Sequence, residues 1–206
     1  MKNCKVFFSQ LVIIFLFFSH PCVLFAKIDK QLIPIIENYI NGITTMKANF
    51  MQIDDKGFKQ SGVFYLSKPH KLRWEYQKPK SIDLVSNSDL SMIYDHELEE
   101  TYFCKENCGP KYFLANQEIN LTKDLKILSL EKSEKEIRLI FTDRKDPSHR
   151  KLITSFTLNP VKIKSVAIKE EGGLDISIEF YDIKYKVKLN ESLFSCIDPN
   201  FFKQKF

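Results

Sequence analysis

The chain has 206 residues, of which 44% are hydrophobic and 13% aromatic, and its formal net charge is +5 at pH 7. Lysine and arginine are interleaved with aspartate and glutamate, without a basic stripe or an arginine-rich run, so the composition argues against a nucleic-acid partner. The length fits one domain with one hydrophobic core.

The N-terminus has the features of a secretory signal peptide. Two lysines precede the apolar run Leu11–Phe18, and the small residue Ala26 offers a cleavage position. The run is far shorter than the ~20 residues of a membrane-spanning helix, and Cys22 lacks the flanking residues of a lipid-attachment site. We therefore predict a cleaved signal peptide over residues 1–26 and a single exported domain over residues 27–206.

Residues 28–46 carry apolar side chains at the spacing of one helix face. After this predicted helix the apolar period changes to two, which predicts about ten or eleven short strands. An irregular insertion with short helical turns interrupts them between Cys104 and Leu125. The predicted strands lie near 47–54, 57–67, 70–77, 80–86, 90–95, 97–103, 126–132, 135–142, 151–158, 161–170 and 174–188.

So many consecutive antiparallel strands must curl into a barrel or divide into two sheets. The second strand of the hairpin Gly62–Pro79 shows why one side would be apolar. Its side chains alternate between an apolar face with Leu72, Trp74 and Tyr76 and a charged face with Lys71, Arg73 and Glu75. This pattern predicts a curved sheet with a solvated outside and an apolar inside, and a barrel of this strand number has room for a ligand cavity.

No residue pattern in the sequence is typical of a catalytic or cofactor site. His70, His96 and His149 lie in turn-like sequence, where we predict solvated side chains. Asp95 precedes His96, but no nucleophile motif accompanies the pair. We therefore predict a protein that is not an enzyme and that uses no cofactor or metal.

Three cysteines follow the predicted signal peptide. Cys104 and Cys108 are spaced to close a short disulfide loop in an oxidising compartment, which would leave Cys196 unpaired and buried. A zinc site is the weaker alternative, because no second Cys or His pair follows at a suitable spacing.

A series of short motifs resembles the LolA family, whose members carry lipoproteins between the inner and outer membranes of Gram-negative bacteria. The resemblance rests on the order and spacing of the motifs, and it extends by pattern over the whole mature chain to Phe194 and Asp198-Pro199. The motifs are Phe50-Met51-Gln52, Gly62–Pro69, Leu72–Tyr76 with Pro79, Asp83–Asn87, Met92–Asp95 and Glu97–Thr101.

The resemblance implies a mostly β fold with helices (α+β), namely an incomplete antiparallel barrel of about 11 strands. This barrel would cover a hydrophobic cavity closed by a helical lid. In the family, the basic residue of an Arg/Lys-Pro motif donates hydrogen bonds to carbonyl groups of the lid. The matching residues here are Lys68 and Pro69, which we therefore predict to be the lid latch. Lysine lacks the planar guanidinium of arginine. The predicted lipid-cavity residues are Phe50, Phe64, Leu66, Leu72, Trp74, Tyr76, Leu84, Ile93 and Phe113.

The resemblance also implies a function. We expect a monomeric periplasmic chaperone that shields the acyl chains of lipoprotein cargo and moves it from the inner to the outer membrane. Its expected partners are an inner-membrane ABC transporter that releases lipoproteins and an outer-membrane acceptor. The alternative is a lipid-binding or envelope-stress sensor module of the same fold that binds a protein partner.

Overall fold

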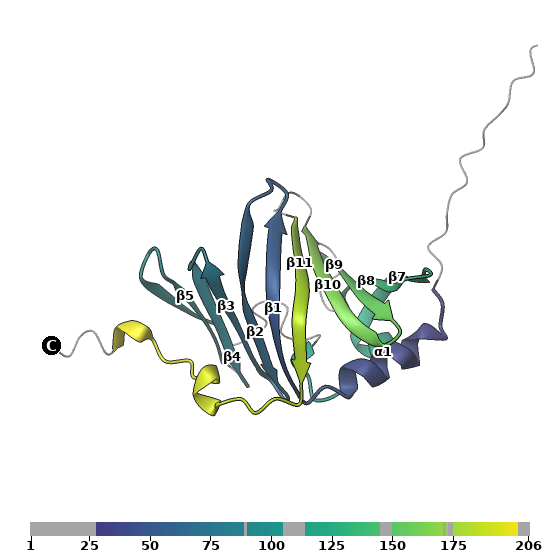
Figure 1. The fold of residues 1–206 in the computed structure, drawn as a ribbon, viewed down its shortest axis with the longest axis horizontal. Helices are drawn as coiled ribbons and strands as arrows, with labels where there is room; N and C mark the ends of the chain where they lie inside the picture. Colours follow the sequence, from purple (N-terminus) through teal and green to yellow (C-terminus); the bar gives the residue numbers. More distant parts are fainter. Residues whose placement is uncertain are drawn as a thin grey trace, which may run out of the picture.

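A single antiparallel sheet of eleven strands makes up most of the protein (Figure 1). The computed structural model describes residues 28–88, 90–104, 114–144, 150–170, 172 and 175–201. The strand order β6-β5-β4-β3-β2-β1-β11-β10-β9-β8-β7 leaves the sheet open between β6 and β7, which confirms the predicted incomplete barrel. The strands are β1 (Thr45–Asp54), β2 (Lys59–Ser67), β3 (Lys71–Lys78), β4 (Ile82–Asn87), β5 (Leu90–Asp95), β6 (Glu100–Cys104), β7 (Leu125–Lys132), β8 (Glu136–Asp143), β9 (Arg150–Leu158), β10 (Val161–Glu170) and β11 (Ile176–Tyr185).

Side-chain alternation gives the curved sheet an apolar inner face. In β1, the buried residues Met46, Ala48 and Phe50 alternate with Lys47 and Asn49, which point to the outer face. The inner-face residues of the strands form one hydrophobic cluster with the buried residues of the helical segments. The period of two read from the sequence therefore identifies the face that carries the core.

Helix α1 (Leu32–Asn41) packs on this inner face. It buries Leu32, Ile36 and Ile40, which recur at the spacing of one helix face. The prediction of a helix over 28–46 is too long, because the chain turns at Gly42 and β1 begins three residues later. In the part of the chain that the structure describes, no helix is both long enough and apolar enough to cross a membrane.

The described end of the insertion, residues 114–124, forms the second part of the cover over the inner face. Its helical turn α3 (Leu121–Asp124), which the sequence predicts, begins where the Asn120 side chain accepts a hydrogen bond from Lys123 N. Four of its residues are buried in the same cluster as α1, namely Leu114, Ala115, Ile119 and Leu121. We call α1 and residues 114–124 together the lid.

The sheet forks between β10 and β11. These strands pair only over Ser165–Ile168 with Ile176–Glu179, whereas β10 pairs with β9 from Val161 to Glu170. The remaining parts of the two strands near the fork, residues 161–164 of β10 and 180–185 of β11, are therefore not paired with each other. Tyr39 of α1 lies between them: its hydroxyl accepts a hydrogen bond from Ile163 N at 2.8 Å and lies 2.8 Å from the hydroxyl of Tyr185.

Residues 186–201, here called the C-terminal strap, run along the outer face of β3–β6 (yellow in Figure 1). The strap contains the 3-10 turn η1 (Glu191–Phe194), and Phe194 is 1% exposed. Below it, Val85, Met92 and Tyr94 are buried on the outer face. The prediction of a solvated outer face is therefore wrong for β3–β5, because the strap covers it with a second small core.

Candidate functional site

A cluster of aromatic rings forms the centre of the inner face. The Trp74 ring lies 5.1 Å from Phe50 and 4.4 Å from Phe64, and Phe180 of β11 lies 5.7 Å from both Phe64 and Trp74. Tyr76 lies 5.0 Å from Phe50 at an edge-to-face angle. The rings come from four neighbouring strands, and their mutual packing adds to the stability that their burial provides.

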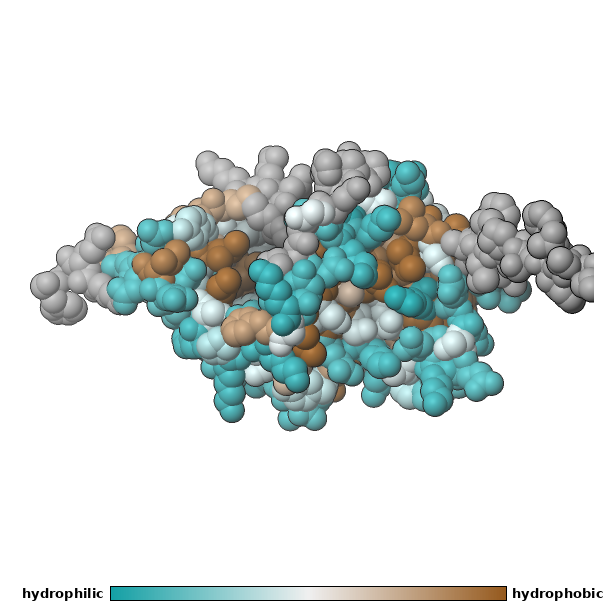
Figure 2. Space-filling view, turned by 90° about the horizontal axis from the view of Figure 1, so that it is seen from above, coloured by the Kyte–Doolittle hydropathy of each residue, from teal (hydrophilic) through white to brown (hydrophobic). Residues whose placement is uncertain are grey.

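The structure brings most of the predicted cavity residues together on this face. Phe113 lies outside the described residues, so its position stays a prediction. In the view from above, hydrophobic surface shows in a recess on the side where Figure 1 places β3–β5 (Figure 2). Five of the predicted residues are buried (Phe50, Phe64, Leu66, Leu72 and Trp74), and three are half-buried on the same face (Tyr76, Leu84 and Ile93).

Two contributors to this wall are absent from the predicted set. Phe180 follows Ile176 and Ile178 at a spacing of two. This alternation within the predicted strand 174–188 indicates that Phe180 lies on the apolar face. Tyr39 is also absent, because its role depends on the fork between β10 and β11. Local sequence does not encode that fork.

The two parts of the lid are bound to each other by polar contacts. Asn41, at the end of α1, forms a two-way pair with the backbone of Ile119: its Nδ2 donates to the carbonyl at 3.0 Å, and its Oδ1 accepts from the N–H at 2.9 Å. Glu37 Oε1 also accepts from Leu121 N at 2.7 Å. These bonds couple α1 to residues 114–124.

The turn between β2 and β3 holds both parts of the lid. Lys68 Nζ donates to the carbonyl of Ile40 in the last turn of α1 at 2.8 Å, and Lys68 N donates to Thr44 O at 2.9 Å. His70 N donates to Ala115 O at 2.7 Å. A cation suits this place, because the carbonyls at a helix C-terminus carry partial negative charge. Burial lowers the pKa of Lys68 to about 8, because desolvation disfavours the charged ammonium.

Tyrosine hydroxyls provide further polar contacts of the inner face. Burial raises the pKa of Tyr39, the residue in the fork, and also that of Tyr185. Tyr76 donates to Gln52 Oε1 at 2.7 Å, and burial raises its pKa to about 12. These phenols remain neutral hydrogen-bonding groups at physiological pH.

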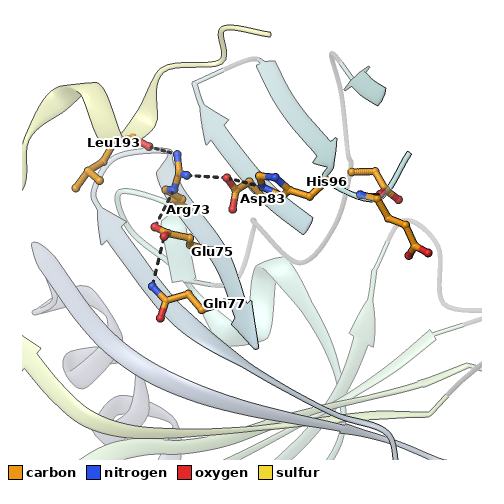
Figure 3. A network of polar contacts seen from close by, with 8 residues as sticks. Arg73, Glu75, Gln77, Asp83, His96 and Leu193 are labelled. Carbon is orange, nitrogen blue, oxygen red and sulfur yellow. Dashed lines mark hydrogen bonds and ion pairs between the residues drawn. The ribbon is translucent and has the colours of Figure 1, made fainter. Parts of the chain in front are cut away.

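A polar network lies on the opposite, outer face of β3 and β4 (Figure 3). Arg73 Nη2 lies 2.9 Å from Asp83 Oδ2, and its Nη1 donates to Leu193 O in the strap at 3.4 Å. His96 Nε2 lies 3.2 Å from the same Asp83 oxygen, and its ring packs edge-to-face on Tyr94 at 4.7 Å. The prediction that His96 is solvated is therefore wrong: the strand register brings it to a carboxylate thirteen positions earlier in the chain.

This network connects β3 and β4 to the strap. Asp83 is 8% exposed, and Arg73 connects it to the strap backbone. His70 lies in the β2–β3 turn with an exposed side chain, and His149 lies outside the described residues. Within the described ranges, no group of three His, Cys, Asp or Glu side chains is arranged to hold a metal ion.

A pocket of ≈ 410 Å³ lies on the outer face, away from the lid. It is lined by Lys47, Asn49, Asp182, Ile183 and Lys184, next to the register shift between β1 and β11. Four of these five residues are charged or polar. This pocket is therefore not the predicted lipid cavity, whose walls are the inner-face residues under the lid.

The cysteines are placed only in part. Cys104 ends β6 and is disulfide-bonded, and its predicted partner Cys108 lies outside the described residues. Cys196 is half-buried in the strap, with its Sγ 3.8 Å from the carbonyl oxygens of both Val85 and Leu90. The pairing of Cys104 with Cys108 stays a prediction.

Comparison with known proteins covers most of the chain. Residues 41–196 match the family model described as outer membrane lipoprotein carrier protein LolA. The chain is 24% identical over 198 residues to an outer-membrane lipoprotein carrier protein of Legionella pneumophila (strain Paris), covering 91% of this chain and 94% of the relative. It is 25% identical over 207 residues to one of Francisella tularensis subsp. tularensis (strain WY96-3418), covering 93% and 94%. Among solved structures, a LolA superfamily protein from Nitrosomonas europaea superposes with a TM-score of 0.46 at 9% identity, covering 82% of this chain and 98% of that one.

Proposed function

Because the chain belongs to the family described as outer membrane lipoprotein carrier protein LolA, we propose that it carries lipoproteins from the inner to the outer membrane. The mature protein, residues 27–206, would act in the periplasm as a monomer and without catalysis. Its partners would be an inner-membrane ABC transporter that releases the cargo and an outer-membrane acceptor. The acyl chains of the cargo would lie against the inner face of the sheet.

The observation that carries this proposal is the pairing of an apolar wall with a lid held by polar contacts. The wall centres on Trp74 and its aromatic neighbours, and the lid contacts it through Ile36 and Ile40. Each CH₂ group that leaves water contributes about 0.8 kcal/mol. An acyl chain on the wall can therefore replace the apolar contacts of the lid with equivalent contacts of its own.

Release requires that closure of the empty lid competes with the cargo. A closed state stabilised by its own hydrogen bonds lowers the net affinity for acyl chains, because loading must first break those bonds. The bonds available are the one from Lys68 to Ile40 O, the one from His70 N to Ala115 O, and those of Tyr39. A lysine offers one point charge where arginine would offer a planar fork, so Lys68 makes a weaker latch that favours loading.

The proposal is tested by loading and release. The mature chain is isolated from the bacterial envelope, and mass spectrometry identifies any lipoprotein that accompanies it. In vitro, loaded protein is mixed with acceptor vesicles and the transfer of lipoprotein is followed with time. Protein that arrives free of lipoprotein and also fails to accept one in vitro would refute carriage.

The latch is tested separately with Lys68→Leu. We expect this variant to load at least as well as the wild type and to release about tenfold more slowly, since the hydrogen bond from Lys68 to Ile40 O that it removes contributes about 1.4 kcal/mol to closure. Lys71→Leu is the matched control, because Lys71 lies in the same hairpin but pairs with Glu191 of the strap at 2.5 Å. Wild-type release by Lys68→Leu would exclude the latch and leave carriage intact.

A further inference from the structure

The inner-face residues of β2–β6 form rows that cross the strands in register. The middle row runs Phe64, Trp74, Leu84, Ile93 and Tyr102, each directly opposite the next. Exposure increases along it, from 1% at Phe64 and 8% at Trp74, through half-buried Leu84 and Ile93, to 51% at Tyr102. The row therefore connects the buried aromatic cluster to the open edge of the sheet.

The two neighbouring rows become polar on the outer strands. On one side, Asp95 of β5 stands opposite Glu100 of β6. On the other side, Ser86 of β4 stands opposite Ser91 of β5, and their hydroxyls are 3.0 Å apart. On β5 and β6 the apolar surface of the inner face is thus one residue wide, whereas on β4 it also includes Ile82, which stands opposite Asp95. We call the row from Trp74 to Tyr102 the apolar lane.

The dimensions of the lane match one acyl chain. Strands lie about 4.8 Å apart, so the three steps from Trp74 to Tyr102 span about 14 Å. A bilayer core of about 30 Å is made of two opposed layers of chains, so each chain extends about 15 Å. The lane is long enough for one chain, and on β5 and β6 its polar borders leave no apolar surface beside it for a second.

The outer end of the lane is polar. The Tyr102 hydroxyl donates to Glu100 Oε2, so the last ring of the lane has an apolar side and a hydrogen-bonded polar tip. This arrangement suits the place where an acyl chain meets its ester or amide carbonyl and then water. The inner end at Trp74 offers only ring contacts, with Phe50 and Phe64 beside it.

We propose that one acyl chain of the cargo lies in the apolar lane, with its methyl end at Trp74 and its carbonyl end at Tyr102. The chain then enters sideways, over the open β6 edge. The proposal rests on the proposed lipoprotein carriage and specifies the route and the position of one chain. It makes Tyr102 a positioning residue for the polar end of the lipid.

The test uses tryptophan quenching by bromine, which requires contact. The chain has a single tryptophan, Trp74, which reports on the inner end of the lane. A variant combining Trp74→Phe with Tyr102→Trp moves the reporter to the outer end. Its matched control combines Trp74→Phe with Phe103→Trp, because Phe103 is equally exposed, at 52%, but points to the opposite face of β6. Co-elution in gel filtration verifies that each variant binds the lipopeptide.

Two synthetic lipopeptides carry bromine, one near the methyl end of an acyl chain and one near its carbonyl end. We expect methyl-end bromine to quench most of the Trp74 fluorescence, and carbonyl-end bromine to quench most of that of the Tyr102→Trp variant. The Phe103→Trp control should lose little with either probe.

The outcomes separate the lane from carriage itself. If Trp74 is quenched but the Tyr102→Trp reporter is quenched no more than the Phe103→Trp control, the lane is refuted and carriage stands. Quenching of the Tyr102→Trp variant by methyl-end bromine, and not by carbonyl-end bromine, would refute the stated direction of the chain. If the lipopeptides bind none of the proteins, both the lane and the proposed lipoprotein carriage are refuted.

Discussion

Opening of the lid should depend on pH through Lys68. In the closed structure its ammonium donates to Ile40 O, and burial lowers its pKa from 10.5 to about 8. Opening returns the group to water and to its ordinary pKa, so between pH 8 and 10.5 the open state binds more protons than the closed one. Raising the pH through this window therefore favours the closed lid. Below about pH 8, Lys68 is charged in both states and contributes no pH dependence.

The size of the effect follows from the same pKa difference. At about 1.4 kcal/mol for each pKa unit, the difference between 10.5 and about 8 sets an upper limit of about 3.4 kcal/mol. Lys68 is only half-buried, and water screens its charge, so we expect about 1–2 kcal/mol. This corresponds to a five- to thirtyfold decrease in the open fraction.

The assay is an electron paramagnetic resonance distance measurement between labels at two exposed positions, Asn38 on α1 and Gln77 on β3. Labels attached through ketone-bearing amino acids leave the native cysteines untouched. The open fraction of the wild type should fall from pH 8 to 10.5, and that of Lys68→Met should not change. Lys71→Met, which removes a charge from the same hairpin without touching the lid, should behave as the wild type does. An equal pH response in Lys68→Met, or opening that increases with pH, would refute the reasoning.

Three further substitutions test other parts of the structure. Asn41→Ala removes the two-way pair that joins the lid segments, so hydrogen exchange of residues 114–124 should rise about tenfold for a loss of ~1.4 kcal/mol; unchanged exchange would mean that the segments are coupled by packing alone. Phe194→Ala empties a fully buried site under the strap and should lower the free energy of unfolding by about 3–5 kcal/mol in chemical denaturation, whereas Phe58→Ala, at a residue 55% exposed, should change it by less than about 0.5 kcal/mol. Gly62→Ala would place a Cβ 2.0 Å from Glu75 O; the backbone must shift, so we expect a markedly lower melting temperature, and a wild-type value would contradict the strand register.

Alternation along the strands was sufficient to predict most of the fold. Each strand found in the structure overlaps a predicted one, because a one-sided apolar period of two is a local property of the sequence. The end of α1 was harder to predict. Ile43 and Met46 continue the helical spacing of apolar residues, yet both are buried beyond the helix, where the chain has already turned at Gly42.

What covers a sheet face is not a local property. Leu84 and Val85 are consecutive apolar residues in β4, as are Met92 and Ile93 in β5, so each strand has apolar side chains on both faces. Such runs indicate burial on both sides, and they were the available signal for the cover on the outer face. The identity of that cover, a strap about a hundred residues later in the chain, depends on tertiary packing.

The fork between β10 and β11 has a mechanical consequence. Among the described residues, the backbone pairing between the panel β6-β5-β4-β3-β2-β1-β11 and the panel β10-β9-β8-β7 is limited to four register pairs, Ser165–Ile168 with Ile176–Glu179. A sheet resists bending least where its hydrogen bonds are fewest. The Tyr39 hydroxyl connects the same two strands through Ile163 N and the Tyr185 hydroxyl. Withdrawal of α1 would therefore remove a connection between the two panels together with the cover of the inner face, and would leave the line between β10 and β11 as the part of the sheet that bends most easily.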